Sequence, residues 1–523
     1  MSFWRGVGVR AVTVAAAVAV TAMPNEGSSP RAAEADTLRG VDGLTRAYDF
    51  ILEARFDQVD AELRRACGAA PPQACDVLAA TAIWWRILLD PESRALDGEF
   101  SAAVERAIDT TEAWAEESPE DAEAWFYLGG AYAARVQWRV LRDEKLAAAR
   151  DGKRIRQALE QAVELDPGLD DAYFGLGMYK YYADVAPTAA KILRFLLLLP
   201  GGDREEGLEE MLRARNRGRL LQGEADYQLH IIYLWYERRT ERAIELLQGL
   251  NEQYPANPLF LSQLAEIQDR YQHDVTASLA TWRSLLAAGR EQRVNAAKLA
   301  EVQARLGVAR QLERLHQTDH AIEHLQSVVS ARPQAPFAAL PLAHLRLGEA
   351  FDRLGERAAA VAAYRAALAF APAHDPYNIA SNARELLRRT PNQNRTQAYR
   401  LSLEGFRRLE HHELTAAAGV LQRSLQLNPA DPVARYRYGR VLQAQKHDAE
   451  ALAQYELTIA EARACPAPIL GAAYLEAARL HERAGQVPEA TGYYETAASL
   501  FGAAADTRAA ATRALTRLRG TTK

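Results

Sequence analysis

The sequence repeats a helical unit along most of its length. Apolar residues recur at i, i+3, i+4 and i+7 from about residue 36 onward, and strand patterns are almost absent. Alanines at positions where packed helices cross recur on top of this pattern. They are spaced 34, 44, 39, 57, 34 and 39 residues apart, at Ala243, Ala277, Ala321, Ala360, Ala417, Ala451 and Ala490. Such a chain is expected to stack helical hairpins, because one hairpin alone leaves its apolar face uncovered.

The segment from Phe337 to Pro372 shows one complete unit. Gly348 and Ala360 are small residues that let two helices approach closely, Tyr364 fills the space between hairpins, and the final proline ends the second helix. From about Asp121 to Ala498 the chain resembles the tetratricopeptide-repeat (TPR) superfamily. The resemblance implies an all-α solenoid of helical hairpins that winds into a right-handed superhelix.

Residues 187–267 carry a second resemblance. They contain an apolar helix, a Gly-Asp-Arg turn, a Gly-Leu helix start and two aromatic-rich helices. This order resembles the inclusion-body-clearance family of TPR proteins, which implies a fold and a binding role rather than a reaction. In the turn, Asp203 is predicted to cap the following helix. No lysine and hydroxyl residue follow the glycines, so a phosphate-binding loop is not favoured.

Two departures from the period define the domain organisation. The long step from Ala360 to Ala417 has room for an extra helix, which we predict at Tyr377–Arg389. All eight tryptophans lie at or before Trp282, so the first half is richer in aromatic residues. We therefore predict an export signal with a spacer at 1–35, an aromatic-rich helical domain at 36–290, and a TPR arm at 291–520.

The N-terminus has the features of an export signal. Arg5 and Arg10 form a basic region, Ala11–Val20 is a short apolar run, and small residues that suit cleavage follow at Ala22 and Ala35. The run is shorter than the ~20 residues that a spanning helix needs. The sequence therefore predicts an exported chain, periplasmic or extracellular, with no transmembrane segment after signal cleavage.

The cysteines agree with export. Cys67 and Cys75 flank a turn with the sequence GAAPPQA between two helical patterns. A helical hairpin brings such positions together, and an oxidising compartment would join them, so we predict a disulfide. The alternative is that they are two unrelated small core residues. Cys465 is left over and is predicted to be a buried free thiol.

Charge and motifs give little sign of chemistry. The net charge of −5 and the pI near 6.2 provide no basic footprint for nucleic acid. His316, His320 and His324 have the spacing of a metal site, but the repeat places a turn at 317–319 that separates the first from the others. In that turn Asp319 is the predicted helix cap. We predict no metal, no cofactor and no enzymatic activity.

The repeat also predicts a binding surface. First helices of TPR hairpins line the concave groove, and an arginine-rich groove suits a peptide with acidic and apolar groups. The alternative is that these charges only solvate the groove and balance one another. The predicted partner-binding residues are Arg310, Arg314, Glu349, Arg353, Tyr436 and Arg440, and the same register adds Glu313, Asp352, Arg479, Glu482 and Arg483.

Two functions follow as expectations. The first is a non-catalytic protein–protein interaction scaffold of the cell envelope that binds a peptide or protein in the groove. The second is a helical ligand-binding protein or cell-envelope enzyme with a site in the aromatic N-terminal half. A pocket lined by Tyr182 and Asp184 would favour the second function, and an open C-terminal groove would favour the first.

Overall fold

A computed structural model describes residues 38–185 and 201–521, and in these ranges it contains 24 α-helices and no β-strand. The all-α fold of successive helical hairpins predicted from the sequence is confirmed. The predicted export signal and the apolar run before Gly201 lie outside the described residues. The chain divides into two compact units, residues 1–229 and 230–523, with the boundary inside one helix. The predicted division at residue 290 lies within the second unit, between two helices.

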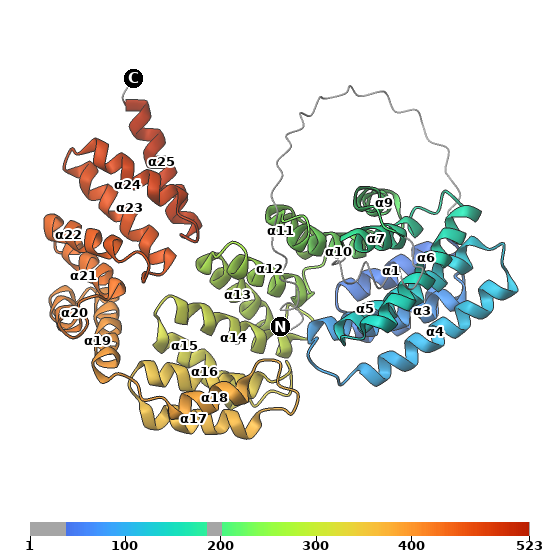
Figure 1. The fold of residues 1–523 in the computed structure, drawn as a ribbon, viewed down its shortest axis with the longest axis horizontal. Helices are drawn as coiled ribbons and strands as arrows, with labels where there is room; N and C mark the ends of the chain where they lie inside the picture. Colours follow the sequence, from blue (N-terminus) through green and yellow to red (C-terminus); the bar gives the residue numbers. More distant parts are fainter. Residues whose placement is uncertain (1–37, 186–200, 522–523) are drawn as a thin grey trace. The chain divides into compact units, whose positions relative to one another are not determined.

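Unit 1 (residues 1–229) consists of four hairpins followed by the start of a ninth described helix (Figure 1). The pairs are α1–α2, α3–α4, α5–α6 and α7–α9, and the first helices α1, α3, α5 and α7 also contact one another in sequence. The side chain of Asp203 accepts hydrogen bonds from the amides of Glu205 and Glu206, as predicted. The helices are α1 (Val41–Leu52), α2 (Phe56–Ala66), α3 (Pro72–Leu89), α4 (Asp97–Glu117), α5 (Ala122–Leu141), α6 (Lys145–Leu165), α7 (Ala172–Val185), α9 (Arg204–Arg217) and α10 (Gln222–Trp235).

Unit 2 (residues 230–523) continues the hairpin pattern from the end of α10. Its hairpins are α12–α13, α14–α15, α16–α17, α19–α20, α21–α22 and α23–α24. The helices are α11 (Thr240–Gln253), α12 (Pro258–Arg270), α13 (Val275–Arg290), α14 (Ala297–Arg314), α15 (Thr318–Ala331), α16 (Ala339–Arg353), α17 (Arg357–Phe370), α18 (Ile379–Arg388), α19 (Gln393–Glu410), α20 (Leu414–Leu427), α21 (Pro432–Ala444), α22 (Asp448–Ala460), α23 (Ala467–Arg483), α24 (Val487–Ser499) and α25 (Ala505–Thr521).

From α11 onward, the crossing positions agree with the predicted repeat in every second helix except α13. The predicted alanines of α11, α15, α17, α20, α22 and α24 are each the fourth residue of their helix and are fully buried. In α13 the fourth residue is Ser278, so the prediction of Ala277 was wrong by one position. Ser278 fits because it is small and its hydroxyl donates a hydrogen bond to the carbonyl of Ala265, 2.8 Å away.

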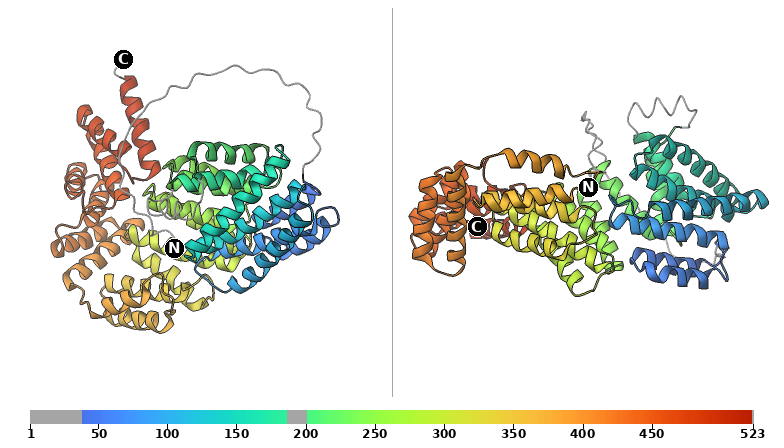
Figure 2. Two further views of the ribbon diagram at one scale, coloured as in Figure 1. Left: turned by 45° about the vertical axis from the view of Figure 1, so that its right-hand side comes forward. Right: turned by 90° about the horizontal axis from the view of Figure 1, so that it is seen from below.

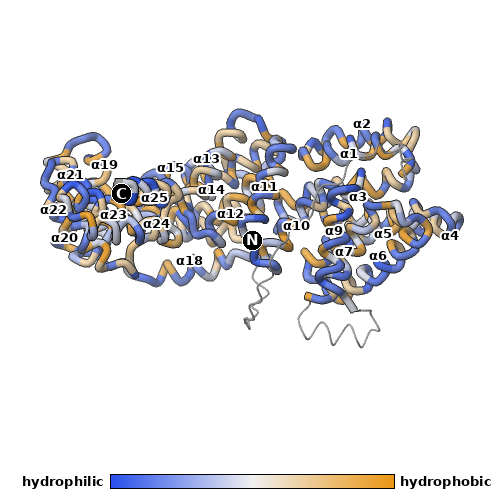
Figure 3. Tube along the Cα trace, turned by 90° about the horizontal axis from the view of Figure 1, so that it is seen from above, coloured by the Kyte–Doolittle hydropathy of each residue, from blue (hydrophilic) through white to orange (hydrophobic). Residues whose placement is uncertain are grey.

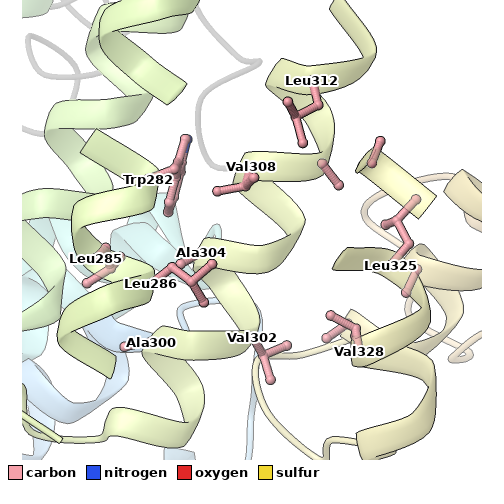
Figure 4. Packing of buried hydrophobic residues seen from close by; sticks show 14 of the residues in the cluster. Trp282, Leu285, Leu286, Ala300, Val302, Ala304, Val308, Leu312, Leu325 and Val328 are labelled. Atoms are coloured by element: carbon pink, nitrogen blue, oxygen red, sulfur yellow. The ribbon is translucent and has the colours of Figure 1, made fainter. Parts of the chain in front are cut away.

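Apolar packing continues from each hairpin to the next. In the cluster around α13, α14 and α15, Trp282 of α13 lies beside Val308 of α14, while Leu325 and Val328 extend from α15 (Figure 4). The neighbour of Val308 is Gly307, where an added Cβ would lie 2.3 Å from the Trp282 ring. A large side chain on one helix thus requires a glycine on the facing helix.

The predicted extra helix is confirmed as α18, and it is fixed at both ends. Asp375 accepts hydrogen bonds from the amides of Ile379 and Ala380 at the start of α18. Arg357 donates to the carbonyls of Leu386 and Leu387 at its end, at 3.1 and 2.7 Å. Both sets of contacts satisfy backbone groups that a helix terminus leaves without partners. The helix therefore forms a defined part of unit 2.

Cys67 and Cys75 are joined by a disulfide across the turn between α2 and α3, with their Cα atoms 6.4 Å apart. Cys465 is a buried free thiol, as predicted, and burial raises its pKa to about 12. A thiol with such a pKa is almost fully protonated at neutral pH and is therefore a poor nucleophile.

Hydrophilic and hydrophobic residues alternate along the helices (Figure 3). Among the helices of the described residues, none combines the length and the hydrophobicity needed to cross a bilayer.

We predict that Gly348→Ala destabilises unit 2 by about 1–3 kcal/mol, the usual range for an overpacked core. An added Cβ would lie 2.3 Å from the Tyr364 ring, which is itself fully buried and held by a hydrogen bond to Asp352. Urea denaturation followed by circular dichroism measures the change.

The matched control is Gly419→Ala in α20, where an added Cβ meets no atom within 4 Å. It should be neutral or stabilising by up to about 1 kcal/mol, because alanine is the better helix former. If the two variants have equal stability, the glycine at the crossing is not required by packing.

Candidate functional site

One face of unit 2 is built from the first helices of its hairpins, which we call the first-helix face. The helices α12, α14, α16, α19, α21, α23 and α25 contact one another in this order. Figure 2 shows the helices of unit 2, coloured from green to red along the sequence, in two further views. The repeat places the predicted partner-binding residues on α14, α16 and α21 of this face.

The first part of the face is bound together by ion pairs between α12 and α14. Arg310 contacts Glu266 at 2.7 Å and Asp269 at 3.4 Å, and Arg314 also contacts Asp269. The Asp269 side chain is only 8% exposed. These contacts join neighbouring hairpins, so Arg310 and Arg314 already have carboxylate partners within the chain.

The next pair of helices repeats this arrangement. Arg353 of α16 contacts Glu313 of α14 at 3.1 Å and lies 5.8 Å from the centre of the Tyr399 ring. Burial raises the pKa of Glu313, and the guanidinium of Arg353 opposes that shift. Glu349 contacts Arg346 of its own helix at 2.7 Å. The predicted alternative, that groove charges balance one another, describes these residues well.

Beyond α16, buried side chains of the first-helix face form hydrogen bonds with one another and with the turn between α14 and α15. Arg437 of α21 is 3% exposed and donates hydrogen bonds to the carbonyl of His316 and the hydroxyl of Ser402, at 2.8 and 2.9 Å. Thr318 and Tyr399 share a hydrogen bond of 2.7 Å. The turn between α14 and α15 thus packs against α19 and α21, although 121 residues separate His316 from Arg437.

The three histidines of the possible metal site have different surroundings. His316 lies in the turn against the Tyr399 ring, and burial lowers its pKa to about 3. His320 contacts Arg407, while desolvation lowers the pKa of the half-buried His324. In the ranges that the structure describes, no three His, Cys, Asp or Glu residues lie together as metal ligands would.

The predicted cap of α15 was wrong. Asp319 lies one residue inside the helix and contacts Arg407 of α19 at 2.5 Å, and Gln317 occupies the cap position without a side-chain hydrogen bond. The carboxylate accepts a hydrogen bond from the amide of His320 at 2.9 Å, but its main partner is the guanidinium of another hairpin. A charge-assisted pair of this kind is stronger than a single cap contact.

The last part of the face, from α21 to α25, carries the remaining predicted residues. Tyr436 is half-buried, its ring lies 5.9 Å from that of Tyr455, and burial raises its pKa to about 12 against the opposing effect of Arg440. Arg440 is exposed and makes no ion pair with any described residue. It is the one predicted arginine whose donors are all available to a partner.

A cavity of about 340 Å³ opens beside this region, within the size range of ligand sites. Its apolar side is formed by Ala510, Ala514 and Tyr494, and its charged side is formed by Arg479, Glu482, Arg483 and Arg517. Burial raises the pKa of Glu482, but the hydroxyl of Tyr494 and the guanidinium of Arg517 outweigh it, and the pKa is lowered. Glu482 is therefore ionised at neutral pH.

The arginines of the cavity are held in fixed positions by carboxylates. Arg479 contacts Glu476 at 2.5 Å, Arg483 contacts Asp448 at 2.8 Å, and Arg517 contacts Glu482 at 2.7 Å. The repeat pattern missed Arg517, because α25 follows the last hairpin and carries no crossing glycine or aromatic residue. Its basic spacing, RAAATRALTRLR, was the available signal.

Unit 1 has a cavity of its own, of about 360 Å³, between α2, α3 and α4. Its apolar lining is mainly Val59, Ala82 and Ile83, and Arg86 and Glu99 form an ion pair of 2.9 Å at its edge. Tyr182 and Asp184, which would have marked a ligand site in this half, lie on α7 and do not line it.

No known family profile matches the sequence, and no curated protein matches it. Solved TPR structures do match. The TPR domain of P58(IPK) is 13% identical, with 74% of this chain and 99% of that one covered and a TM-score of 0.23. A tetratricopeptide repeat protein from Parabacteroides merdae is 15% identical, with 57% and 98% covered and a TM-score of 0.25. The TPR2AB domain of yeast Sti1, in complex with pHSP90, is 15% identical, with 57% and 96% covered and a TM-score of 0.21. What this chain has in common with these proteins is an all-α fold of successive helical hairpins, which its own helices show.

Proposed function

We propose that this protein is a non-catalytic scaffold that binds a segment of a partner protein on the first-helix face between α21 and α25. The observation that carries the proposal is the combination of Tyr436 and the unpaired Arg440 with the neighbouring cavity. The predicted arginines on α14 and α16 already pair with carboxylates of the chain, so we move the binding site from the whole groove to its C-terminal part.

The chemistry of this region specifies the partner. Four arginines (Arg440, Arg479, Arg483 and Arg517) outnumber three carboxylates, Asp448, Glu476 and Glu482, so the region carries a net positive charge. A guanidinium binds a carboxylate through two parallel hydrogen bonds. The apolar wall of Ala510, Ala514 and Tyr494 suits an aliphatic side chain. The segment that fits has a carboxylate and an apolar residue close together.

We place this scaffold in the cell envelope, as a periplasmic or extracellular protein. The basic and apolar N-terminus supports this, and a disulfide between Cys67 and Cys75 suits an oxidising compartment. N-terminal sequencing of the protein purified from cells tests the location. A start between about residues 22 and 36 is expected, and an intact Met1 would contradict export.

Selection from a displayed library of random peptides tests the binding site. We expect the full chain to enrich peptides that combine Asp or Glu with Leu, Ile or Val. The double variant Arg440→Gln, Arg479→Gln should bind these peptides about tenfold less tightly, since arginines in such sites are frequent hot spots. Fluorescence anisotropy with the enriched peptides measures the affinity.

The control is Arg365→Gln, Arg423→Gln, which removes the same charge from the second helices α17 and α20. Both of these arginines are exposed and make no ion pair with described residues. The control should leave the affinity within about twofold of the wild type, because exposed substitutions away from a site have small effects. Equal binding by the wild type and the Arg440, Arg479 variant would remove the basis of the proposal.

A further inference from the structure

A second basic region lies outside the binding site proposed between α21 and α25, which we call the first-helix site. It spans the end of α18, the connection and the start of α19. Residues 384–400 contain five arginines and a single carboxylate, Glu385, in a chain whose net charge is −5. We call this the arginine segment, and its arginines are Arg384, Arg388, Arg389, Arg395 and Arg400. All five are exposed, and none forms an ion pair with any residue in the described ranges.

The segment is held on a fixed support. Ile379 and Ala383 are fully buried and anchor α18 against a cluster that includes Tyr364. Arg357 caps the end of α18 and is itself held by two contacts with Asp352, at 3.0 and 2.7 Å. The arginines therefore extend from a packed helix and the start of the next helix, which reduces the entropy lost when a partner binds.

Helix stability does not explain this charge pattern. Arg384 and Arg388 are spaced i, i+4, where like charges repel each other. A cation near the end of α18 is favourable to the helix dipole, but Arg395 lies in the first turn of α19, where a cation is unfavourable. Arg384, Arg388 and Arg389 also belong to the insertion that lengthens the repeat, so hairpin stacking does not require these three.

We propose that the arginine segment is a docking surface for an acidic segment of a partner protein, separate from the first-helix site. Several guanidinium groups with few competing carboxylates attract and grip successive Asp or Glu side chains. Residues 379–400 offer no exposed aromatic ring for stacking on nucleic-acid bases, since Tyr399 is buried. They also offer no exposed large apolar side chain for insertion into a membrane.

The test is fluorescence anisotropy of the full chain with a labelled polyglutamate peptide, which lacks the apolar residue expected at the first-helix site. The variant with all five arginines of the segment replaced by glutamine should bind about tenfold less tightly. Binding by the wild type should also weaken as salt rises, because exposed charges are screened. Circular dichroism should show unchanged helicity, since all five side chains are exposed.

A matched control replaces five dispersed arginines of unit 2 by glutamine: Arg332, Arg365, Arg423, Arg463 and Arg513. These are also exposed and make no ion pair with described residues, so the control loses the same charge without losing the cluster. Its affinity should stay within about threefold of the wild type.

Three results would overturn the proposal. The first is an equal loss of peptide affinity in both variants, which would show attraction by net charge alone. The second is an affinity for the peptide that is the same in the segment variant as in the wild type. The third is no peptide binding, together with segment-dependent binding of phosphatidylserine vesicles or of a single-stranded oligonucleotide, which would assign the surface to lipid or nucleic acid. The Arg440→Gln, Arg479→Gln variant should retain polyglutamate binding. This result would show that the arginine segment binds independently of the first-helix site.

Discussion

Glu224→Ala is expected to destabilise unit 1 by roughly 3–5 kcal/mol, since each buried donor left without a partner costs about 1–3 kcal/mol. Glu224 is 4% exposed and accepts hydrogen bonds from the Tyr48 hydroxyl, the Trp85 indole and the Gln228 amide, at 3.0, 3.1 and 3.0 Å. These groups come from α1, α3 and α10, so one carboxyl group holds three separate helices. Denaturant unfolding, followed by the tryptophan fluorescence of unit 1, measures the loss.

The isosteric variant Glu224→Gln separates shape from charge. Burial raises the pKa of Glu224, and the hydrogen bonds from Gln228 and Tyr48 oppose that shift. A raised folded-state pKa stabilises the protein below the unfolded value, about 4.3, and this contribution is lost as the pH rises through the folded value. Glutamine does not titrate, so Glu224→Gln should gain stability relative to the wild type as the pH rises from about 4 to 8.

Unfolding midpoints of the wild type and of Glu224→Gln, measured between about pH 4 and 8, test this pH dependence. A stability difference that moves in the opposite direction would show that the ionised carboxylate is the stabilising form. A Glu224→Ala variant as stable as the wild type would show that the convergence of three helices on this group has no energetic consequence.

Arg437→Ala is expected to destabilise unit 2 by about 2–4 kcal/mol, from a cavity and a lost charge-assisted hydrogen bond. Its guanidinium is buried, lies 4.7 Å from the centre of the Phe406 ring, and bridges the His316 carbonyl and the Ser402 hydroxyl. Burial lowers its pKa, but an arginine stays charged at any physiological pH. Amides at the turn between α14 and α15 should exchange faster with solvent in this variant.

Arg437→Met is the control, because it keeps most of the volume and removes the buried charge. Apolar replacements of buried charges are often close to neutral. We therefore expect Arg437→Met to lose less than half the stability that Arg437→Ala loses, with faster exchange at the turn in both. If exchange at residues 315–319 is unchanged in both variants, the Arg437 guanidinium does not stabilise the turn between α14 and α15.

The helical hairpins and much of their register are predictable because they depend on short-range spacing. Gly348 and Tyr364 are close in sequence, and the long interval between Ala360 and Ala417 is enough to reveal α18. The one-residue error at Ala277 has a physical cause, since serine can also occupy a crossing position when its hydroxyl finds a carbonyl. A pattern that admits only alanine and glycine misses that possibility.

The site was less predictable, because it depends on how hairpins are offset from one another. Arg310 and Arg440 look alike in the sequence, yet the first meets Glu266 of the neighbouring helix and the second meets no described carboxylate. Pairing across hairpins is set by helix rotation and axial offset, which the repeat spacing does not encode. The Glu224 cluster was missed for a similar reason, since Tyr48 lies 176 residues away.

Hydrogen–deuterium exchange of the full chain, with and without a peptide from the selected pool, tests the central claim most directly. Binding on the first-helix face predicts slower exchange in α21, α23 and α25, and this protection should disappear in the Arg440→Gln, Arg479→Gln variant. Unit 1 should be unaffected. Protection confined to α2, α3 and α4, or to the ion-paired helices α12 to α16, would contradict the proposed site and place partner binding elsewhere in the chain.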